Sequence, residues 1–341
     1  MKLLATSVAL LITFFMQNLE ASQMSSQQQH RFGRFSIDLP SLSIVHVNAT
    51  YLGVDVRGPS PAVSLEKFKD KADSEAAKYD QSEMKTDQLQ DDIFKAGGLD
   101  PKVEFGKKQL VQYRFDSVRN ESFIAYHPTP RTSDTTARLT KLTSEGIYDF
   151  EQTDGSASML NQISSQLIKA STAFKWYKDT NSVPAHAFCI ANGCFDDGAK
   201  QTDRETAKLS AVLGRQPDTE LSITTNARVR ADQDYNDIET RADDEVSNLE
   251  RTTGHVTMLR RGYRSIVGQR GFELGVSIEN PGHPPAYVFV WASTGELHNP
   301  MKPIIDFDLR IMPTEEGVST VKTREEAEHI WDSLVQSFRA R

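Results

Sequence analysis

Residues 304–311 read IIDFDLRI, and residues 323–339 read TREEAEHIWDSLVQSFR. The first run alternates apolar and polar residues, as a half-buried strand does. In the second run, Thr323 and Glu326 have the spacing of a helix capping box. Apolar residues then recur at steps of three and four and form one helix face: Ala327, Ile330, Trp331, Leu334, Val335 and Phe338. This pair of elements predicts a strand followed by a helix.

Strands that precede helices recur along the rest of the chain. Apolar periodicity predicts three further helices, over about residues 64–79, 157–177 and 231–251, with Ser64 as the N-cap of the first. Alternating runs predict strands at residues 32–39, 45–56, 109–115, 122–126, 147–150, 187–190, 220–229, 256–259, 263–267, 272–278, 287–291 and 304–311. This order predicts an α+β fold with largely antiparallel sheets.

The two parts of the chain show the same order of elements. The first helix of each part begins near Ser64 or Ala231, and the last begins near Ser156 or Thr323, so both pairs lie 167 residues apart. We interpret this spacing as a divergent duplication, although the residues do not align visibly and a chance spacing is the alternative. The expected domains are residues 32–181 and 182–341, each an antiparallel sheet with two helices.

The N-terminus has the layout of a secretory signal peptide. Lys2 precedes a run of about 14 apolar residues, Leu3–Met16, and Ala21 is a small residue at a suitable cleavage point. The run is shorter than the roughly 20 residues that span a bilayer. We therefore expect a signal peptide at residues 1–21, a flexible leader at 22–31 and an exported, soluble mature protein. An uncleaved anchor or a buried helix is the alternative.

Charge and cysteine content narrow the class further. The 341-residue chain has 25% charged residues and a net charge of −8, so nucleic acid is not an expected partner. Its only cysteines are Cys189 and Cys194, which flank an Asn-Gly turn sequence. We expect a disulfide between them, because exported proteins retain such bonds. Two free thiols are the alternative.

No constellation of catalytic residues is recognisable. The Gly-x-Ser-x-Gly motif of lipases and the His-Glu-x-x-His zinc motif are absent. Asp196-Asp197-Gly198 is interpreted as a turn, and His186 near Cys189 as incidental. The arginines around Gly262 are best explained by a solvated sheet face, with an anion site as the alternative: Arg260, Arg261, Arg264 and Arg270. We expect no metal, no cofactor and a binding protein; an enzyme with an unrecognised site is the alternative.

One cluster of charge is a candidate partner-binding surface. The helix expected after Ala231 carries Asp232, Asp234, Asp237, Glu239, Asp243 and Asp244, and its exposed face is therefore negative. A solvated helix face is the alternative, because acidic residues in a first turn stabilise the helix dipole.

Several short motifs together resemble a known family, the two-domain periplasmic immunity proteins of type VI secretion lipase effectors. The first part contains Gly33-Arg34-Phe35 ending in Asp38-Leu39-Pro40. The second part contains, in order, Phe188-Cys189-Ile190, Arg260-Arg261-Gly262-Tyr263-Arg264, Val267-Gly268, Gly271-Phe272-Glu273, Phe289-Val290-Trp291 and Pro303-Ile304-Ile305. The resemblance spans nearly the whole mature chain.

The resemblance implies a periplasmic inhibitor that clamps a phospholipase effector between two lobes and blocks access of its substrate. The chain departs from the family at Arg31 and Ala191, where a cysteine and an aspartate are frequent, so no family disulfide is carried over. A periplasmic small-ligand receptor with an interdomain cleft is the competing function.

Overall fold

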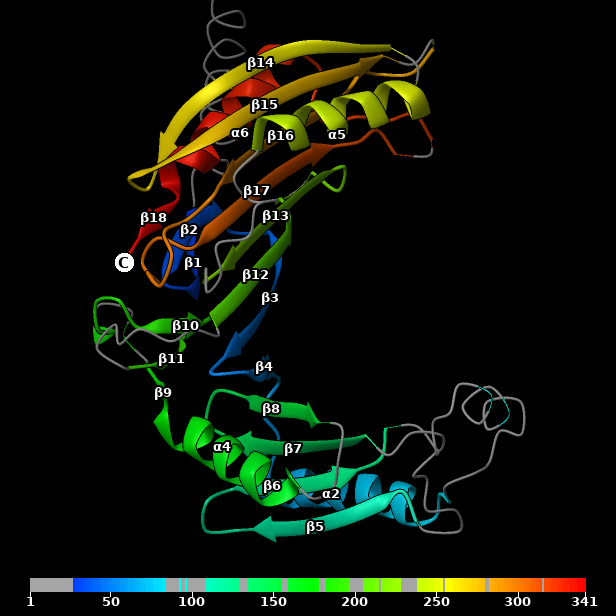
Figure 1. Cartoon of the computed structure of the whole chain (residues 1–341), viewed down its shortest axis with the longest axis vertical. Helices are drawn as coiled ribbons and strands as arrows, with labels where there is room; N and C mark the ends of the chain where they lie inside the picture. The colour runs from blue at the N-terminus through cyan, green and yellow to red at the C-terminus, as the bar shows by residue number, and fades with distance from the viewer. Residues whose placement is uncertain are drawn as a thin grey trace, which may run out of the picture. The chain divides into compact units, whose positions relative to one another are not determined.

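The computed structural model describes residues 27–83, 108–128, 134–154, 159–177, 182–196, 205–214, 216–227, 238–253, 255–279, 282–314 and 316–341, with the single residues 92, 96 and 179. The chain forms two compact units (Figure 1). One, here called the middle unit, is Val47–Ala207; the other, the terminal unit, combines Met1–His46 with Lys208–Arg341. The unit boundaries lie inside two strands and differ from the single boundary expected near Asn181–Pro184.

The middle unit is built on an antiparallel sheet with the strand order β3-β4-β8-β7-β6-β5. Helix α2 packs on β5 and β6, and α4 packs on β7 and β8. The elements are β3 (Ile44–Tyr51), β4 (Val54–Ser60), α2 (Leu65–Asp80), β5 (Leu110–Asp116), β6 (Glu121–Tyr126), β7 (Thr135–Leu142), β8 (Ile147–Asp154) and α4 (Leu160–Ala173).

The terminal unit has an antiparallel sheet with the order β12-β13-β17-β16-β15-β14. Helix α5 packs on β14 and β15, while α6 contacts β16. The elements are β12 (Glu205–Val212), β13 (Thr219–Asn226), α5 (Ile238–Thr253), β14 (His255–Ile266), β15 (Gln269–Glu279), β16 (Ala286–Ser293), β17 (Ile304–Ile311) and α6 (Arg324–Ser337).

Both sheets therefore have the same topology. Each is made by two strands, a helix, four strands and a second helix, and in each the strands lie in the order 1-2-6-5-4-3. This confirms the prediction of two similar α+β domains with antiparallel sheets. The shared order of strands within the sheet supports a duplication more strongly than the helix spacing does.

Two hairpins complete the units. The hairpin β1 (Gln27–Gly33) and β2 (Phe35–Pro40) belongs to the terminal unit, where β18 (Arg339–Ala340) pairs with β2. The hairpin β10 (Phe188–Ile190) and β11 (Gly193–Phe195) belongs to the middle unit, where β9 (Phe174–Trp176) pairs with β11. Each hairpin thus lies in the unit that the sequence did not predict for it.

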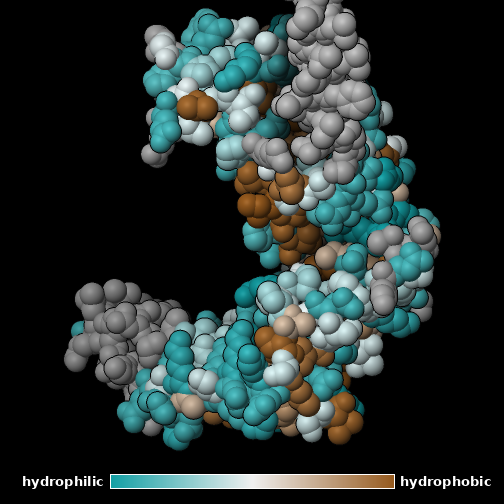
Figure 2. Space-filling model, turned by 180° about the vertical axis from the view of Figure 1, so that it is seen from behind, coloured by the Kyte–Doolittle hydropathy of each residue, from teal (hydrophilic) through white to brown (hydrophobic). Residues whose placement is uncertain are grey.

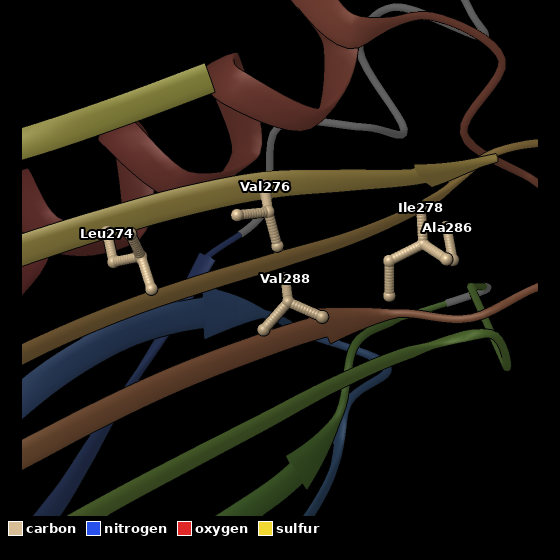
Figure 3. Close-up of a cluster of buried hydrophobic side chains, with 5 residues drawn as sticks. All are labelled: Leu274, Val276, Ile278, Ala286 and Val288. Atoms are coloured by element: carbon tan, nitrogen blue, oxygen red, sulfur yellow. The ribbon is translucent and has the colours of Figure 1, made fainter. Parts of the chain in front are cut away.

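Helix α5 and helix α6 cover cores built from different residues of the terminal sheet. Half-buried Ala242, Val246 and Leu249 pack against a cluster of side chains from β15 and β16. Figure 3 shows that these side chains point to the same side of the two strands: Leu274, Val276, Ile278, Ala286 and Val288. Trp331 of α6 is fully buried against Phe289 and Phe307. The alternating strands thus bury apolar residues beneath both helices.

The helix starts follow the predictions from capping chemistry. The side chain of Ser64 accepts a hydrogen bond from the Lys67 amide, and Thr323 and Glu326 form the predicted capping box. The predicted helix over 157–177 is shorter, because residues 174–176 leave it to form β9. The helix expected from Ala231 is described from Ile238 onward, and its expected first turns lie outside the described residues.

Several strand predictions were wrong in detail. The segments expected as single strands at residues 32–39 and 45–56 contain hairpin turns, at Gly33-Arg34 and at Leu52-Gly53, where both glycines have positive φ. Residues 27–31, expected in the leader, form the first part of β1. Conversely, the two short strands expected at 256–259 and 263–267 are one strand, β14, with an irregular register between Met258 and Arg260.

The predicted disulfide between Cys189 and Cys194 is present and buried. The two cysteines lie opposite each other on β10 and β11, in a hairpin with only three paired positions. Reduction is expected to lower the free energy of unfolding by about 2 kcal/mol, since so short a loop gains little from closure. Urea unfolding with and without a reductant measures this loss. The Cys189→Ala/Cys194→Ala variant is the control, and an unaltered protein whose unfolding does not change with the reductant would contradict the assignment.

Candidate functional site

The acidic helix is the predicted partner-binding surface. Of its candidate residues, Asp232, Asp234 and Asp237 lie outside the described residues, while Glu239, Asp243 and Asp244 lie on α5. Asp243 and Asp244 are exposed and Glu239 is half-buried. The three are therefore within one turn and a half of α5, but they are not equally accessible.

Asp243 has a structural partner. The Arg261 Nη2 of β14 donates to both carboxylate oxygens of Asp243, at 2.7 and 3.0 Å. This hydrogen bond raises the pKa of Arg261 above its ordinary value. Because both side chains are exposed, the pair adds little to stability, although it links α5 to β14. Asp244 is then the described acidic residue that best tests a partner contact.

The arginines of β14 are not all solvated, contrary to the sequence-based interpretation. Arg260 donates two hydrogen bonds to Asp332 of α6, at 2.7 and 2.8 Å. Arg264 bonds to Glu273 at 2.6 Å and to Asp332 at 2.9 Å. These four side chains are between 13% and 35% exposed, so the network is shielded from water in part.

The network has a clear electrostatic effect. The hydrogen bond from Arg260, with a second from Arg264, holds the pKa of Asp332 below its usual value. Trp331 Nε1 donates to Glu273 at 2.6 Å, which joins the same network to the core beneath α6. The arginines therefore balance carboxylates of the same unit. Arg270 instead lies over the Tyr263 ring, with its guanidinium carbon 3.9 Å from the ring centroid.

A groove lies on the sheet of each unit. In the middle unit, a groove of about 430 Å³ lies between α2 and the sheet, and Arg138 in it pairs with Glu75. In the terminal unit, a groove of about 560 Å³ lies over β12, β13 and β17, with Lys208, Glu220 and Arg310 among its lining residues. Figure 2 shows a largely hydrophilic surface on the face in view, with hydrophobic residues in separate patches.

The residues considered for catalysis do not assemble a site within the described ranges. Cys189 is disulfide-bonded, so it offers no thiol nucleophile near His186. Asp197 and Gly198 lie outside the described residues. No group of three or more His, Cys, Asp or Glu in the described part is arranged to hold a metal ion. Among the described residues, no helix has the length and apolar character needed to cross a membrane.

The fold is shared with solved structures of immunity proteins. The chain is similar to the immunity protein TplEi of the type VI secretion system from Pseudomonas aeruginosa, with a TM-score of 0.70, 15% identity, and 92% of this chain and 97% of that chain covered. It is also similar to a chain of the Tle4-Tli4 complex, with a TM-score of 0.71, 16% identity and coverages of 93% and 98%. At these identities the likeness shows the fold.

The family match is specific to the second part of the chain. Residues 183–341 match the family model described as the Tle cognate immunity protein 4 C-terminal domain. The resemblance noted from the sequence motifs is thereby confirmed. None of the curated proteins compared with this chain matches it significantly in sequence. The matched range begins close to residue 182, where the sequence placed the second domain.

Proposed function

We propose that this protein is an immunity protein, which binds and inhibits a lipase effector of a type VI secretion system. The observation that carries the proposal is the family match of residues 183–341, together with the likeness of the whole chain to TplEi and to the Tle4-Tli4 complex. The protein acts by binding and not by catalysis. The signal-peptide layout of residues 1–21 supports action in the periplasm.

The inhibitor contacts the effector with both units and blocks the access of substrate to its active site. A stable protein inhibitor buries more than about 1,000 Å² in total. Two linked units reach that area readily, and linkage raises the effective concentration of the second contact. The acidic face of α5, with Asp244 exposed on it, is our candidate for part of the contact: Asp232, Asp234, Asp237, Glu239, Asp243 and Asp244.

Co-expression with a lipase effector, which we expect among the neighbouring genes, followed by pull-down and a phospholipase assay, tests the function. We expect a stable complex and loss of phospholipase activity. A lipase that remains unbound and fully active would contradict the proposal and would favour a small-ligand receptor. Intact-mass measurement of the periplasmic fraction tests the expected start of the mature protein near Ser22.

The contribution of α5 is tested by charge reversal in the same assay. Asp244→Lys is expected to weaken binding about tenfold at low salt and less at high salt, because exposed charges are screened. Asp70→Lys on α2, also exposed, is the control with the same change of charge. If Asp244→Lys binds the lipase as tightly as the unaltered protein does, α5 is not part of the contact, whereas the inhibition itself is tested separately above.

A further inference from the structure

Each compact unit contains one hairpin from the opposite half of the chain. The first half, residues 27–176, runs from hairpin β1–β2 through the sheet and helices of the middle unit to β9. The second half, residues 188–340, repeats this order from hairpin β10–β11 to β18. Yet β1–β2 lies in the terminal unit and β10–β11 in the middle unit. The halves are therefore repeats in sequence order but not in packing.

We infer that the two repeats have exchanged their N-terminal hairpins, so that each repeat supplies part of the other's core. The last strand of each repeat marks the exchange. In the middle unit, β9 of the first repeat pairs with β11 of the second, with Phe174 opposite Phe195. In the terminal unit, β18 of the second repeat pairs with β2 of the first, with Ala340 opposite Phe35.

Aromatic residues repeat this arrangement in the middle unit. Phe174, which follows α4, packs edge-on against Phe150 of β8, with ring centroids 5.5 Å apart and an interplanar angle of 79°. The Phe174 ring also lies 5.0 Å from that of Phe195 in the exchanged hairpin. Three phenylalanines thus join the sixth strand, the end of the second helix and the hairpin of the other repeat.

The terminal unit contains a similar triad of phenylalanines. Phe338, which follows α6, packs edge-on against Phe307 of β17, at 5.6 Å and 78°. The Phe338 ring lies 5.2 Å from that of Phe35 in hairpin β1–β2. Phe338 and Phe307 correspond in position to Phe174 and Phe150. The hairpin phenylalanines do not correspond by register, because Ala340 pairs with Phe35 as Trp176 pairs with Gly193. The shared contact between the last helix and the sixth strand still indicates a common origin of the two hairpin sites.

A glycine makes room for the aromatic contact in the hairpin of the middle unit. At Gly193, a Cβ atom would lie 2.0 Å from the Phe174 ring, so only glycine admits the aromatic contact there. The exchange leaves each repeat without its own hairpin, as in a domain-swapped dimer whose two chains are joined into one.

The exchange couples each hairpin to the stability of the opposite sheet. Phe32, Phe35, Ile37 and Leu39 of β1–β2 are at most 1% exposed, and contacts of this hairpin include α6. Loosening of α6 and β17 must therefore expose the amides at residues 27–40. Loosening of α4 and β8 must expose those of β10–β11 instead. Without exchange, each hairpin would open with its own half of the chain.

Hydrogen exchange of the full-length protein, measured by peptide mass spectrometry, tests this inference. Phe338→Ala is expected to speed amide exchange in β2, residues 35–40, at least tenfold and to leave β11, residues 193–195, unchanged. The matched Phe174→Ala variant is expected to do the reverse. Phe338→Leu and Phe174→Leu replace them if the alanine variants do not fold.

The reciprocal pattern of amide exchange tests this inference independently of the proposed function, because the measurement contains no effector. Faster amide exchange at residues 35–40 in the Phe174→Ala variant, or unchanged amide exchange there in both Phe338 variants, would overturn the inference. Inhibition of the lipase could still hold in that case. Conversely, a protein that binds no lipase would still show the reciprocal pattern if the hairpins are exchanged.

Discussion

Residues 183–341, expressed without the rest of the chain, are expected to lack a cooperative fold although they span the matched family domain. This fragment keeps β10–β11, which belongs to the middle unit, and lacks β1–β2. Removing that hairpin uncovers the core side of the terminal unit, where Phe35 and Phe338 pack together. It also loses four buried side chains, Phe32, Phe35, Ile37 and Leu39.

The energetic loss is comparable with the whole stability of a domain. Burial of a large apolar side chain contributes roughly 1.5–3 kcal/mol, so four of them contribute about 6–12 kcal/mol. Natural domains have only about 5–15 kcal/mol in total. Loss of hairpin β1–β2 from the fragment would therefore remove most of the stability of the terminal unit.

A second fragment provides the matched comparison. Residues 27–46 joined through a flexible Gly/Ser linker to residues 205–341 contain the complete set of terminal-unit strands and both helices. This fragment is expected to unfold cooperatively in urea, as followed by circular dichroism, whereas residues 183–341 are not. Cooperative unfolding of residues 183–341 with a stability equal to that of the linked fragment would show that β1–β2 is dispensable.

The sequence was sufficient for the elements that depend on local chemistry. The Thr323–Glu326 capping box and the Ser64 cap each involve residues three positions apart, so their meaning is visible in a short window. The class of the fold followed from the order of such elements. By contrast, β12 was not predicted, although Ala207, Leu209 and Ala211 alternate with polar residues along it, because two of these three side chains are small.

Which hairpin belongs to which compact unit could not be predicted from the sequence in the same way. Local patterns identify hairpins, but they do not say against which sheet a hairpin packs. The contact between Phe35 and Phe338 joins opposite ends of the chain. A boundary near Asn181 was therefore a natural prediction from the repeated order, and the exchange of hairpins explains why the compact units divide elsewhere.

The candidate site shows the same limit. Arg260 and Arg264 alternate along β14 as residues of a solvated face would. Their partner Asp332 lies 72 and 68 residues away, on the helix that closes the chain. The pairing depends on α6 packing across the sheet. The strand sequence alone therefore suggested that the two arginines are exposed. In the fold they are partly buried and each is paired with the Asp332 carboxylate.

Trp331→Ala is expected to lower the free energy of unfolding of the full-length protein by about 3–5 kcal/mol. Trp331 is fully buried in α6, with its ring 5.7 Å from Phe289 and 5.1 Å from Phe307. Truncation leaves a cavity between two aromatic side chains that rigid neighbouring strands cannot fill. It also removes the donor to Glu273, which keeps its bond from Arg264.

Two controls separate packing from hydrogen bonding. Trp331→Phe keeps most of the ring volume and removes the indole donor, so its expected loss is about 1.5–3 kcal/mol, the range for a bond to a charged group. Leu167→Ala makes a comparable truncation at the fully buried, corresponding turn of α4 in the middle unit. Urea unfolding followed by circular dichroism measures all three. The central role of Trp331 in the terminal core would be refuted by a loss below about 1 kcal/mol in Trp331→Ala, because a cavity of that size cannot be so inexpensive in a close-packed interior.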